Sequence, residues 1–212
     1  MPTKTIYVAT TNAGKLRDFA AAAGSFLTDE LGFAIAPMPC MDRIPPAPEI
    51  EATFAGNARA KAVYYSRLAP GFDIIADDSG IEVDVLDGEP GVRSARFAED
   101  AGFASTGDVN ADNNLLLLQK LAGVPEEKRT ARYRCALALA NSGECVLTSE
   151  GTVEGRIAAQ PQGNGGFGYD PLFYLPDLGK TMAEIDLETK NSLSHRGRAL
   201  EAMLEQIREI FA

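Results

Sequence analysis

Two adjacent aspartates, Asp77 and Asp78, follow the apolar run Phe72–Ala76, which the sequence predicts to be a buried strand. Neighbouring carboxylates repel each other unless a cation or protons neutralise them. Because successive strand residues point to opposite sides, we expect one aspartate to anchor the loop while the other faces a site. The pair indicates a metal or general-base position, although an Asx-type turn explains one aspartate equally well.

A possible phosphate-binding segment, Ala9–Lys15 (ATTNAGK), lies between a predicted strand and a predicted helix. Unpaired amides at a helix N-terminus favour an anion, and a lysine there adds a full positive charge. The segment is not a Walker A loop, because Ala9 replaces its first glycine and Leu16 stands where a serine or threonine should ligate magnesium. A polar turn capped by Asn12 is the alternative interpretation.

A glycine-rich segment, Gly163–Phe173 (GNGGFGYDPLF), surrounds Phe167 and Tyr169 with glycines. Glycine lets the backbone approach a ligand closely, and an aromatic ring can stack on a base. A tight turn around a buried ring is the alternative interpretation.

The single histidine, His195, stands just ahead of the last predicted helix. Ser194 is expected to be the N-cap of that helix, with His195 and Arg196 as surface residues of its first turn. Positive groups at this end oppose the helix dipole, a local conflict that functional sites tolerate.

The composition restricts the partners. A net charge of −10, from 20 basic and 30 acidic residues, argues against a nucleic-acid polymer, which would be repelled at long range. A mononucleotide needs only a local positive pocket, and nearby carboxylates can hold a divalent metal against its phosphates. No apolar run approaches the roughly 20 residues that cross a bilayer, and no secretory signal is evident, so we expect no membrane partner. Cys40, Cys135 and Cys145 share no metal-ligand spacing and are expected to be reduced core or near-core thiols of a cytoplasmic protein.

Hydrophobic periodicity predicts an α/β fold. The last two predicted strands flank an Asn-Ser-Gly turn and form a hairpin, so the sheet should be mixed. The predicted strands are Thr5–Thr10, Phe33–Ala36, Phe72–Ala76, Ile81–Leu86, Thr130–Ala140 and Cys145–Val153, and the predicted helices are Lys15 to about Leu31, Glu51–Ala69, Val109–Leu121 and Leu200–Phe211.

Five segments, in this order, resemble the inosine triphosphate pyrophosphatase family, also called the Ham1 family. They are ATTNAGKLRDF, TFAGNARAKA, ADDSGIEVDVLDGEPGVRSARFA, GGFGYDPLF and SHRGRAL. The resemblance extends over nearly the whole chain and implies a single domain, residues 1–212. That domain would have a long mixed β-sheet flanked by helices, with two lobes around a nucleotide cleft, and would form a homodimer.

The resemblance also implies an activity: Mg²⁺-dependent hydrolysis of non-standard purine nucleotides (ITP, dITP and XTP) to the monophosphate and pyrophosphate. Asp78 corresponds to the general base and magnesium ligand, and Glu49 to a second metal ligand. The residues carried over as substrate-binding are Thr10, Thr11, Asn12, Ala13, Gly14, Lys15, Ser79, Phe167, Gly168, Tyr169, Asp170, Lys190, His195 and Arg196. Thr11 and Asp18 depart from the commoner glycine and glutamate of the family.

The expected mechanism is attack of a water, deprotonated by Asp78, on the α-phosphorus while Lys15 and the loop amides stabilise phosphate oxygens. Donors from His195 or Arg196 would select a 6-keto purine. Two alternatives remain: a Maf-type pyrophosphatase, and a nucleotide-binding regulator that has lost catalysis. The absence of G-x-S-x-G and of a Rossmann fingerprint disfavours a serine hydrolase and a dinucleotide-binding enzyme.

Overall fold

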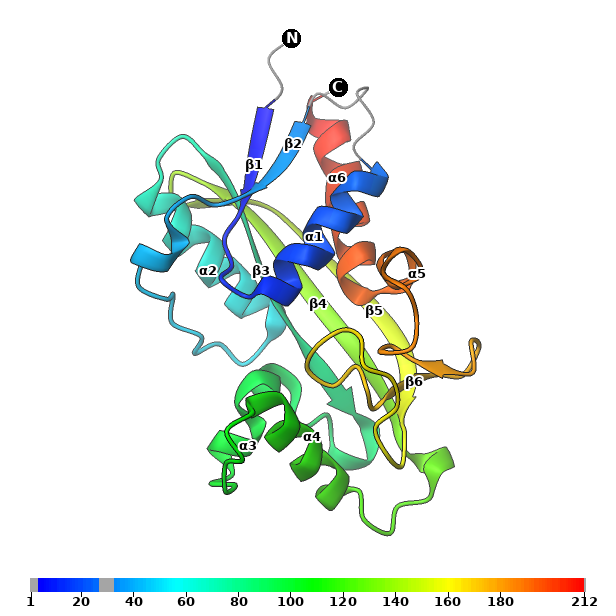
Figure 1. Cartoon of the computed structure of the whole chain (residues 1–212). Coiled ribbons are helices and arrows are strands. Elements are labelled where there is room, and N and C mark those ends of the chain that lie inside the picture. The colour runs from blue at the N-terminus through cyan, green and yellow to red at the C-terminus, as the bar shows by residue number, and fades with distance from the viewer. Residues whose placement is uncertain (1–3, 27–32, 212) are drawn as a thin grey trace. The chain divides into compact units, whose positions relative to one another are not determined.

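The computed structural model describes residues 4–26 and 33–211 and confirms the α/β fold (Figure 1). Within them a mixed seven-stranded sheet has the order β2-β1-β3-β4-β5-β6-β7. The strands are β1 (Lys4–Val8), β2 (Phe33–Pro37), β3 (Asp73–Val83), β4 (Thr130–Asn141), β5 (Glu144–Ile157), β6 (Phe173–Leu175) and β7 (Lys180–Thr181). The helices are α1 (Ala13–Phe26), α2 (Phe54–Leu68), α3 (Phe97–Asp100), α4 (Val109–Lys120), α5 (Leu187–Leu193) and α6 (His195–Phe211).

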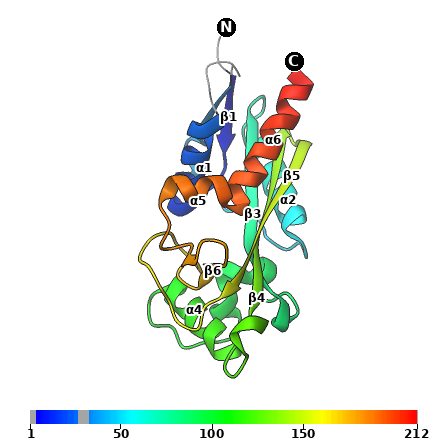
Figure 2. The same ribbon diagram turned by 90° about the vertical axis from the view of Figure 1, so that its right-hand side faces the viewer.

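The chain forms two compact units. Unit 1 comprises residues 1–78, 135–152 and 191–212, and unit 2 comprises residues 79–134 and 153–190. Each of the neighbouring long strands β3, β4 and β5, which Figure 2 shows from the side, therefore contributes residues to both units. The expectation of one domain over residues 1–212 stays a prediction.

In unit 1 the sheet is covered on both faces. Strand β1 pairs in parallel with β2 and with β3. Successive residues of a strand point to opposite faces, and Ile75 joins a cluster with α1 and α6 whereas Ile74 joins a different cluster with α2. Because both faces are buried, β3 reads as a continuous apolar run before its aspartates.

Unit 2 has a core of its own. Apolar side chains of β3, β4 and β5 pack there with residues of α3, α4 and β6. The hairpin prediction is confirmed, since β4 and β5 are sheet neighbours joined at Ser142 and Gly143, both of which have positive φ angles. Two positive φ angles are what the tight hairpin turn requires.

One prediction about β3 is wrong. The sequence suggested two strands separated by a turn at Asp77–Gly80, but β3 continues through these residues. At Gly80 the backbone lies against Ser94, so that an added Cβ would be 2.3 Å from the Ser94 Oγ. The glycine therefore serves close packing rather than a turn. Lys15 and Arg196 lie against Asp77, and Lys61 lies against Asp78, so both carboxylates can stay within the strand.

The remaining elements follow the predicted pattern with shifted ends. Helix α1 is confirmed, but the predicted extension towards Leu31 lies outside the described residues. The predicted strand Ile81–Leu86 is shorter, because residues 84–86 form a 3₁₀ turn. Pro37 ends β2, an edge strand, where a missing amide is tolerated. Strands β6 and β7 and helix α5 were not predicted, since short elements carry little periodicity.

Candidate active site

The predicted catalytic aspartate, Asp78, is buried in β3 of unit 1 beside polar groups of α2. Asn57 donates to its Oδ2 at 3.0 Å, and the Lys61 ammonium lies 3.4 Å from its Oδ1. The same ammonium donates to Glu49 Oε1 at 2.7 Å. Asn57 and Lys61 are four residues apart and therefore share one face of α2. The two predicted metal ligands, Asp78 and Glu49, thus converge on one cationic group.

Burial and charge act against each other at this cluster. Burial raises the pKa of Asp78 above its ordinary value, and the offsetting effects of Lys61, Asn57 and Lys15 are smaller. Burial lowers the pKa of Lys61, but Asp77, Asp78 and Glu49 outweigh it and raise that pKa overall. A carboxylate with a raised pKa is better suited to accept a proton near neutral pH.

The side chain of Asp77 points to the opposite face of β3 from that of Asp78. Its Oδ2 lies 2.8 Å from the Lys15 ammonium and 3.7 Å from Arg196 Nε. Arg196 also donates to Asp18 Oδ2 at 2.5 Å. Burial raises the pKa of Asp77, but Lys15, Arg196 and Lys61 outweigh burial and hold that pKa well below its ordinary value. The expectation that one aspartate anchors and the other faces a site fits this division, because Asp77 is held between the half-buried Lys15 and the buried Arg196.

The loop before α1 is organised by Asn12. Its side-chain oxygen accepts hydrogen bonds from the amides of Gly14 at 2.8 Å and Lys15 at 3.1 Å, which confirms the capping interpretation. Thr10 Oγ1 accepts from the Asn12 amide. Two amides at this helix N-terminus therefore already have a partner, and the Lys15 ammonium is the full positive charge of the loop. Thr11, Ala13 and the other residues of the segment stay predicted phosphate contacts.

In unit 2, Asp170 is the centre of the predicted nucleoside-binding set. Its Oδ2 accepts from the Phe167 amide at 2.8 Å and from the Lys190 ammonium at 2.7 Å. The same ammonium lies 5.1 Å from the centroid of the Phe167 ring, a cation–π arrangement. Lys190, on α5, and the glycine-rich segment are thereby fixed to each other around the half-buried ring of Phe167.

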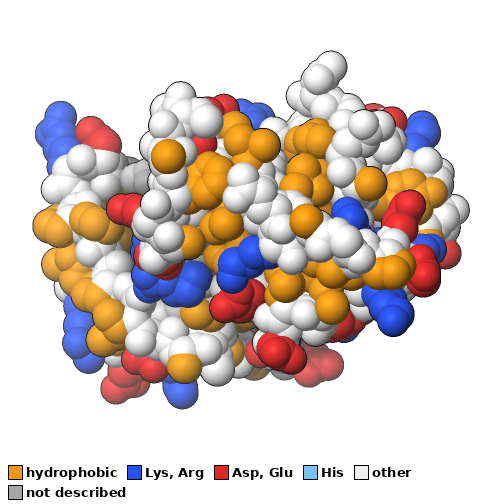
Figure 3. Space-filling view, turned by 90° about the horizontal axis from the view of Figure 1, so that it is seen from below, with side chains coloured by type: hydrophobic (Ala, Val, Ile, Leu, Met, Phe, Trp, Pro, Cys, Tyr) orange, Lys and Arg blue, Asp and Glu red, His pale blue; other side chains and the backbone are white. Residues whose placement is uncertain are grey.

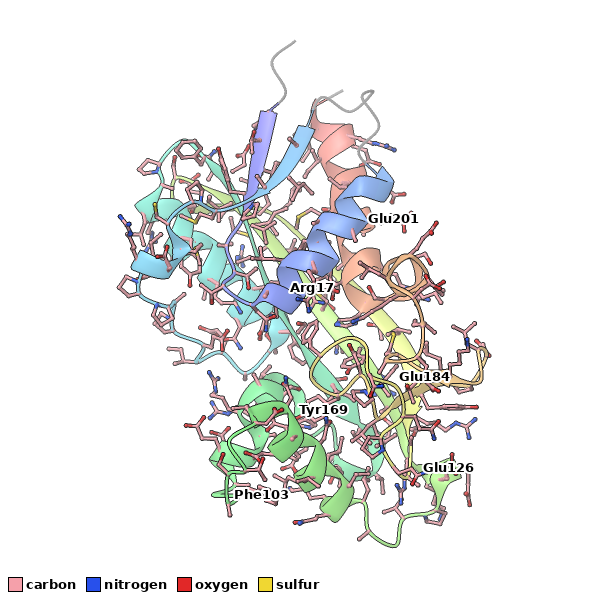
Figure 4. All side chains as sticks on the ribbon, in the orientation of Figure 1. Arg17, Phe103, Glu126, Tyr169, Glu184 and Glu201 are labelled. Atoms are coloured by element: carbon pink, nitrogen blue, oxygen red, sulfur yellow. The ribbon has the colours of Figure 1, made fainter. Side chains whose placement is uncertain are left out.

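Tyr169, labelled in Figure 4, is 5% exposed and its hydroxyl donates to the Ser94 carbonyl at 2.8 Å. Burial raises the pKa of Tyr169. These contacts support the interpretation of a buried ring that holds its segment, which the sequence left open. Gly168 is held from α4, since Asn114 Nδ2 donates to its carbonyl at 3.0 Å. Ser79 follows Asp78 in β3.

At the start of α6 one prediction is confirmed and one is wrong. Ser194 is the N-cap, because its Oγ accepts from the Gly197 amide at 3.0 Å. His195 and Arg196 are not surface residues: they are 7% and 2% exposed. The reason is that Asp18 and Asp77 neutralise Arg196, which no local pattern reveals. A second prediction about burial is wrong in the opposite sense: Cys40 was expected in or near the core but is exposed.

The sequence-predicted residues therefore fall into two sets. Unit 1 holds the residues of the ATTNAGK segment with Glu49, Asp78, His195 and Arg196, and unit 2 holds Ser79, residues 167–170 and Lys190. Sequence reasoning missed Asn57 and Lys61, although their spacing of four on a helix that borders the aspartates was a usable signal. It also missed the partnership of Asp18 with Arg196.

The chemistry of the carboxylate pair fits a magnesium ion. Among the described residues no group of three or more His, Cys, Asp or Glu side chains could hold a metal ion. Magnesium, however, is commonly held by one or two carboxylates together with substrate phosphates. Glu49 and Asp78, which share the Lys61 ammonium, provide such a pair.

On the face drawn in Figure 3, hydrophobic side chains lie among basic and acidic ones. None of the helices in the described part of the chain is long and apolar enough to span a membrane.

Known proteins resemble this chain over almost its full length. The profile of the Ham1 family matches residues 6–206. A dITP/XTP pyrophosphatase of Acidobacterium capsulatum is 54% identical over 205 residues, which cover 96% of this chain and 98% of the relative. The dITP/XTP pyrophosphatase of Geobacillus kaustophilus is 47% identical over 98% of this chain and 96% of its own. The solved structure of a HAM1 protein from Coxiella burnetii has a TM-score of 0.81 at 33% identity and covers 97% of this chain and 99% of its own. With its collinear motifs and the fold that they share, this chain belongs to the Ham1 family.

Proposed function

We propose that this chain is a pyrophosphatase that hydrolyses non-standard purine nucleoside triphosphates (ITP, dITP and XTP) to the monophosphate and pyrophosphate, and so cleanses the nucleotide pool. The observation that supports this chemistry is that Asp77 and Asp78 are adjacent in one strand but have different partners. Asp78 lies against Lys61, which also contacts Glu49, and Asp77 forms an ion pair with Lys15. The names of the two bacterial relatives support the substrate class.

Asp78 is the proposed general base. Its carboxylate orients a water and takes the proton as the water oxygen attacks the α-phosphorus, so that pyrophosphate leaves as a unit. The raised pKa of Asp78 strengthens it as a base, and the hydrogen bond from Asn57 fixes its orientation. Lys61 keeps a share of this carboxylate ionised by its positive charge.

Asp78 and Glu49 are the proposed ligands of Mg²⁺. When bound, such an ion supplies positive charge that neutralises phosphate oxygens as negative charge develops on them. Lys15 acts on the same class of oxygens as a point charge, since Asp77 holds its ammonium in place. The segment from Thr10 to Lys15 is proposed to contact the triphosphate.

Ser79 is proposed to lie beside the triphosphate. The proposed nucleoside-binding residues are Phe167, Gly168, Tyr169, Asp170, Lys190, His195 and Arg196. A ring such as Phe167 offers stacking to any base. Buried donors discriminate more strongly, because a purine with an amino group at position 6 leaves such a donor without its acceptor. A homodimeric state and a cytoplasmic location are also proposed, the latter from the three unpaired cysteines.

The proposal is tested by incubating the protein with MgCl₂ and ITP and resolving the products by ion-exchange chromatography. We expect IMP and pyrophosphate in equal amounts, with ATP turned over far more slowly. IDP with orthophosphate would contradict α-phosphorus attack. The absence of any turnover would favour the regulator alternative, and a preference for nucleoside triphosphates other than these purines would favour the Maf-type alternative.

A further inference from the structure

The Asp170 carboxylate of unit 2 is buried, with 4% of the residue exposed, and has a complete set of donors. The Phe167 amide and the Lys190 ammonium both donate to Oδ2. The donor to Oδ1 is the hydroxyl of Tyr133, at 3.2 Å. Burying an ionised carboxylate is costly unless its oxygens accept hydrogen bonds, so each of these donors matters to its orientation.

Tyr133 is a rigid donor. It lies in β4, it is 6% exposed, and its ring packs against Phe173 with centroids 4.3 Å apart. The other side of the carboxylate is closed as well, because a Cβ at Gly166 would lie only 2.0 Å from Asp170 Oδ2. The strand thus presents a fixed hydroxyl to a carboxylate that has no room to shift towards the loop.

We propose that Tyr133 is a positioning residue for nucleoside binding. Its hydroxyl fixes the Asp170 carboxylate, and that carboxylate fixes both the backbone at Phe167 and the Lys190 ammonium over the Phe167 ring. Tyr133 touches neither the substrate nor the reacting atoms; it acts through Asp170. This inference rests on the proposed function, since it assigns Phe167 and Lys190 to the nucleoside.

The distinguishing variant is Tyr133→Phe, which keeps the ring and removes the hydroxyl. Without its donor on Oδ1 the carboxylate is no longer held from the β4 side, so the Lys190 ammonium and the Phe167 amide have a less fixed acceptor. The loss of one hydrogen bond to a charged group corresponds to roughly a tenfold change in affinity. Asp78 and Glu49 are not part of this set of contacts, so the chemical step should be unaffected.

We expect Tyr133→Phe to raise the KM for ITP and the Kd for IMP about tenfold, with kcat changed less than about twofold. Inhibition by inorganic pyrophosphate, which has no nucleoside, should stay the same. Tyr174→Phe is the matched control, since it removes a tyrosine hydroxyl from β6, another strand of the same sheet and the same unit. Urea unfolding of both variants separates a general loss of stability from a loss of binding.

An unchanged Kd for IMP in Tyr133→Phe would overturn the inference, as would equal losses for IMP and pyrophosphate. A double-mutant cycle with Lys190→Gln adds a second test: the hydroxyl should matter much less once Lys190 is gone, and full additivity would contradict the proposed route through Asp170. Failure of the proposed function would appear in the products formed by the wild-type protein. Failure of this inference would appear in the binding of IMP to Tyr133→Phe, which is measured without turnover.

Discussion

At the scale of single residues, the adjacent aspartates of β3 have divided roles that follow from strand geometry. Asp77 faces the cations Lys15 and Arg196, whereas Asp78 faces Asn57 and Lys61. The pKa of Asp77 is lowered and that of Asp78 is raised, because only Asp77 has enough positive charge close by to overcome its burial. The two carboxylates, identical in type, therefore differ in basicity.

Replacing the proposed base tests this division. Asp78→Asn should reduce kcat by several orders of magnitude, because an amide cannot accept the proton of the attacking water. The variant should still bind ITP, which equilibrium dialysis without turnover can measure. Asp87→Asn, at an exposed position of unit 2, is the matched control and should retain wild-type kcat. Substantial activity in Asp78→Asn would remove Asp78 from its proposed role.

The charge of Lys61 should set the acid limb of the pH–rate profile. Lys61 lowers the pKa of Asp78, so Lys61→Met should raise that pKa further and move the acid limb of kcat/KM to higher pH. Lys120→Met, which removes an exposed ammonium of unit 2, should leave the limb in place. An acid limb that stays in place in Lys61→Met would show that Asp78 does not control it.

The same pKa shifts have consequences for folding. The pKa of Lys61 is raised in the folded state. Its contribution to the free energy of unfolding is therefore complete at pH values below its ordinary pKa and is lost as the pH rises through its folded-state pKa. For Asp77, with a lowered pKa, the contribution is present above the ordinary value of 3.8 and is lost as the pH falls through the folded value.

At the scale of elements, close approach between strands and helices positions the site. Helix α6 begins directly over β5, where a Cβ at Gly151 would lie 2.1 Å from the His195 carbonyl and 2.5 Å from the Ala199 amide. Ser149 Oγ donates to the Ala199 carbonyl at 2.7 Å in the same contact. A glycine in β5 thus allows the first turn of α6 to bring His195 and Arg196 into the buried part of unit 1.

Gly151→Ala should therefore destabilise the fold by about 1–3 kcal/mol, because the added methyl group meets rigid backbone atoms. The midpoint of urea unfolding measures this change. Glu144→Ala, at an exposed position of the same strand, should change stability by no more than about 0.5 kcal/mol. Equal midpoints for wild type and Gly151→Ala would mean that α6 can move away from β5 at little cost.

At the scale of the whole chain, the structure consists of two compact units that share the strands of one sheet. Each unit has its own apolar cluster and its own set of predicted site residues: the carboxylates and Lys15 in unit 1, and the aromatic segment with Lys190 in unit 2. The overall net charge is −10, and the cations of these sets, Lys15, Lys61, Lys190 and Arg196, each lie against a carboxylate of the same unit.

The sequence by itself determined the α/β class, most of the longer elements, the Asn12 and Ser194 caps and the family resemblance, because these depend on local periodicity, capping chemistry and collinear motifs. Only the tertiary structure decided that β3 continues through Asp77–Gly80, that His195 and Arg196 are buried, and that Tyr133 holds Asp170. These features depend on partners far away in the sequence, such as Asp18 for Arg196, and no short-range pattern encodes which distant charge will neutralise a buried one. The aspartate pair and its alternation across a strand were predictable from the sequence, but the partners on each side, Lys15 and Arg196 for Asp77 and Asn57 and Lys61 for Asp78, were decided by the tertiary structure.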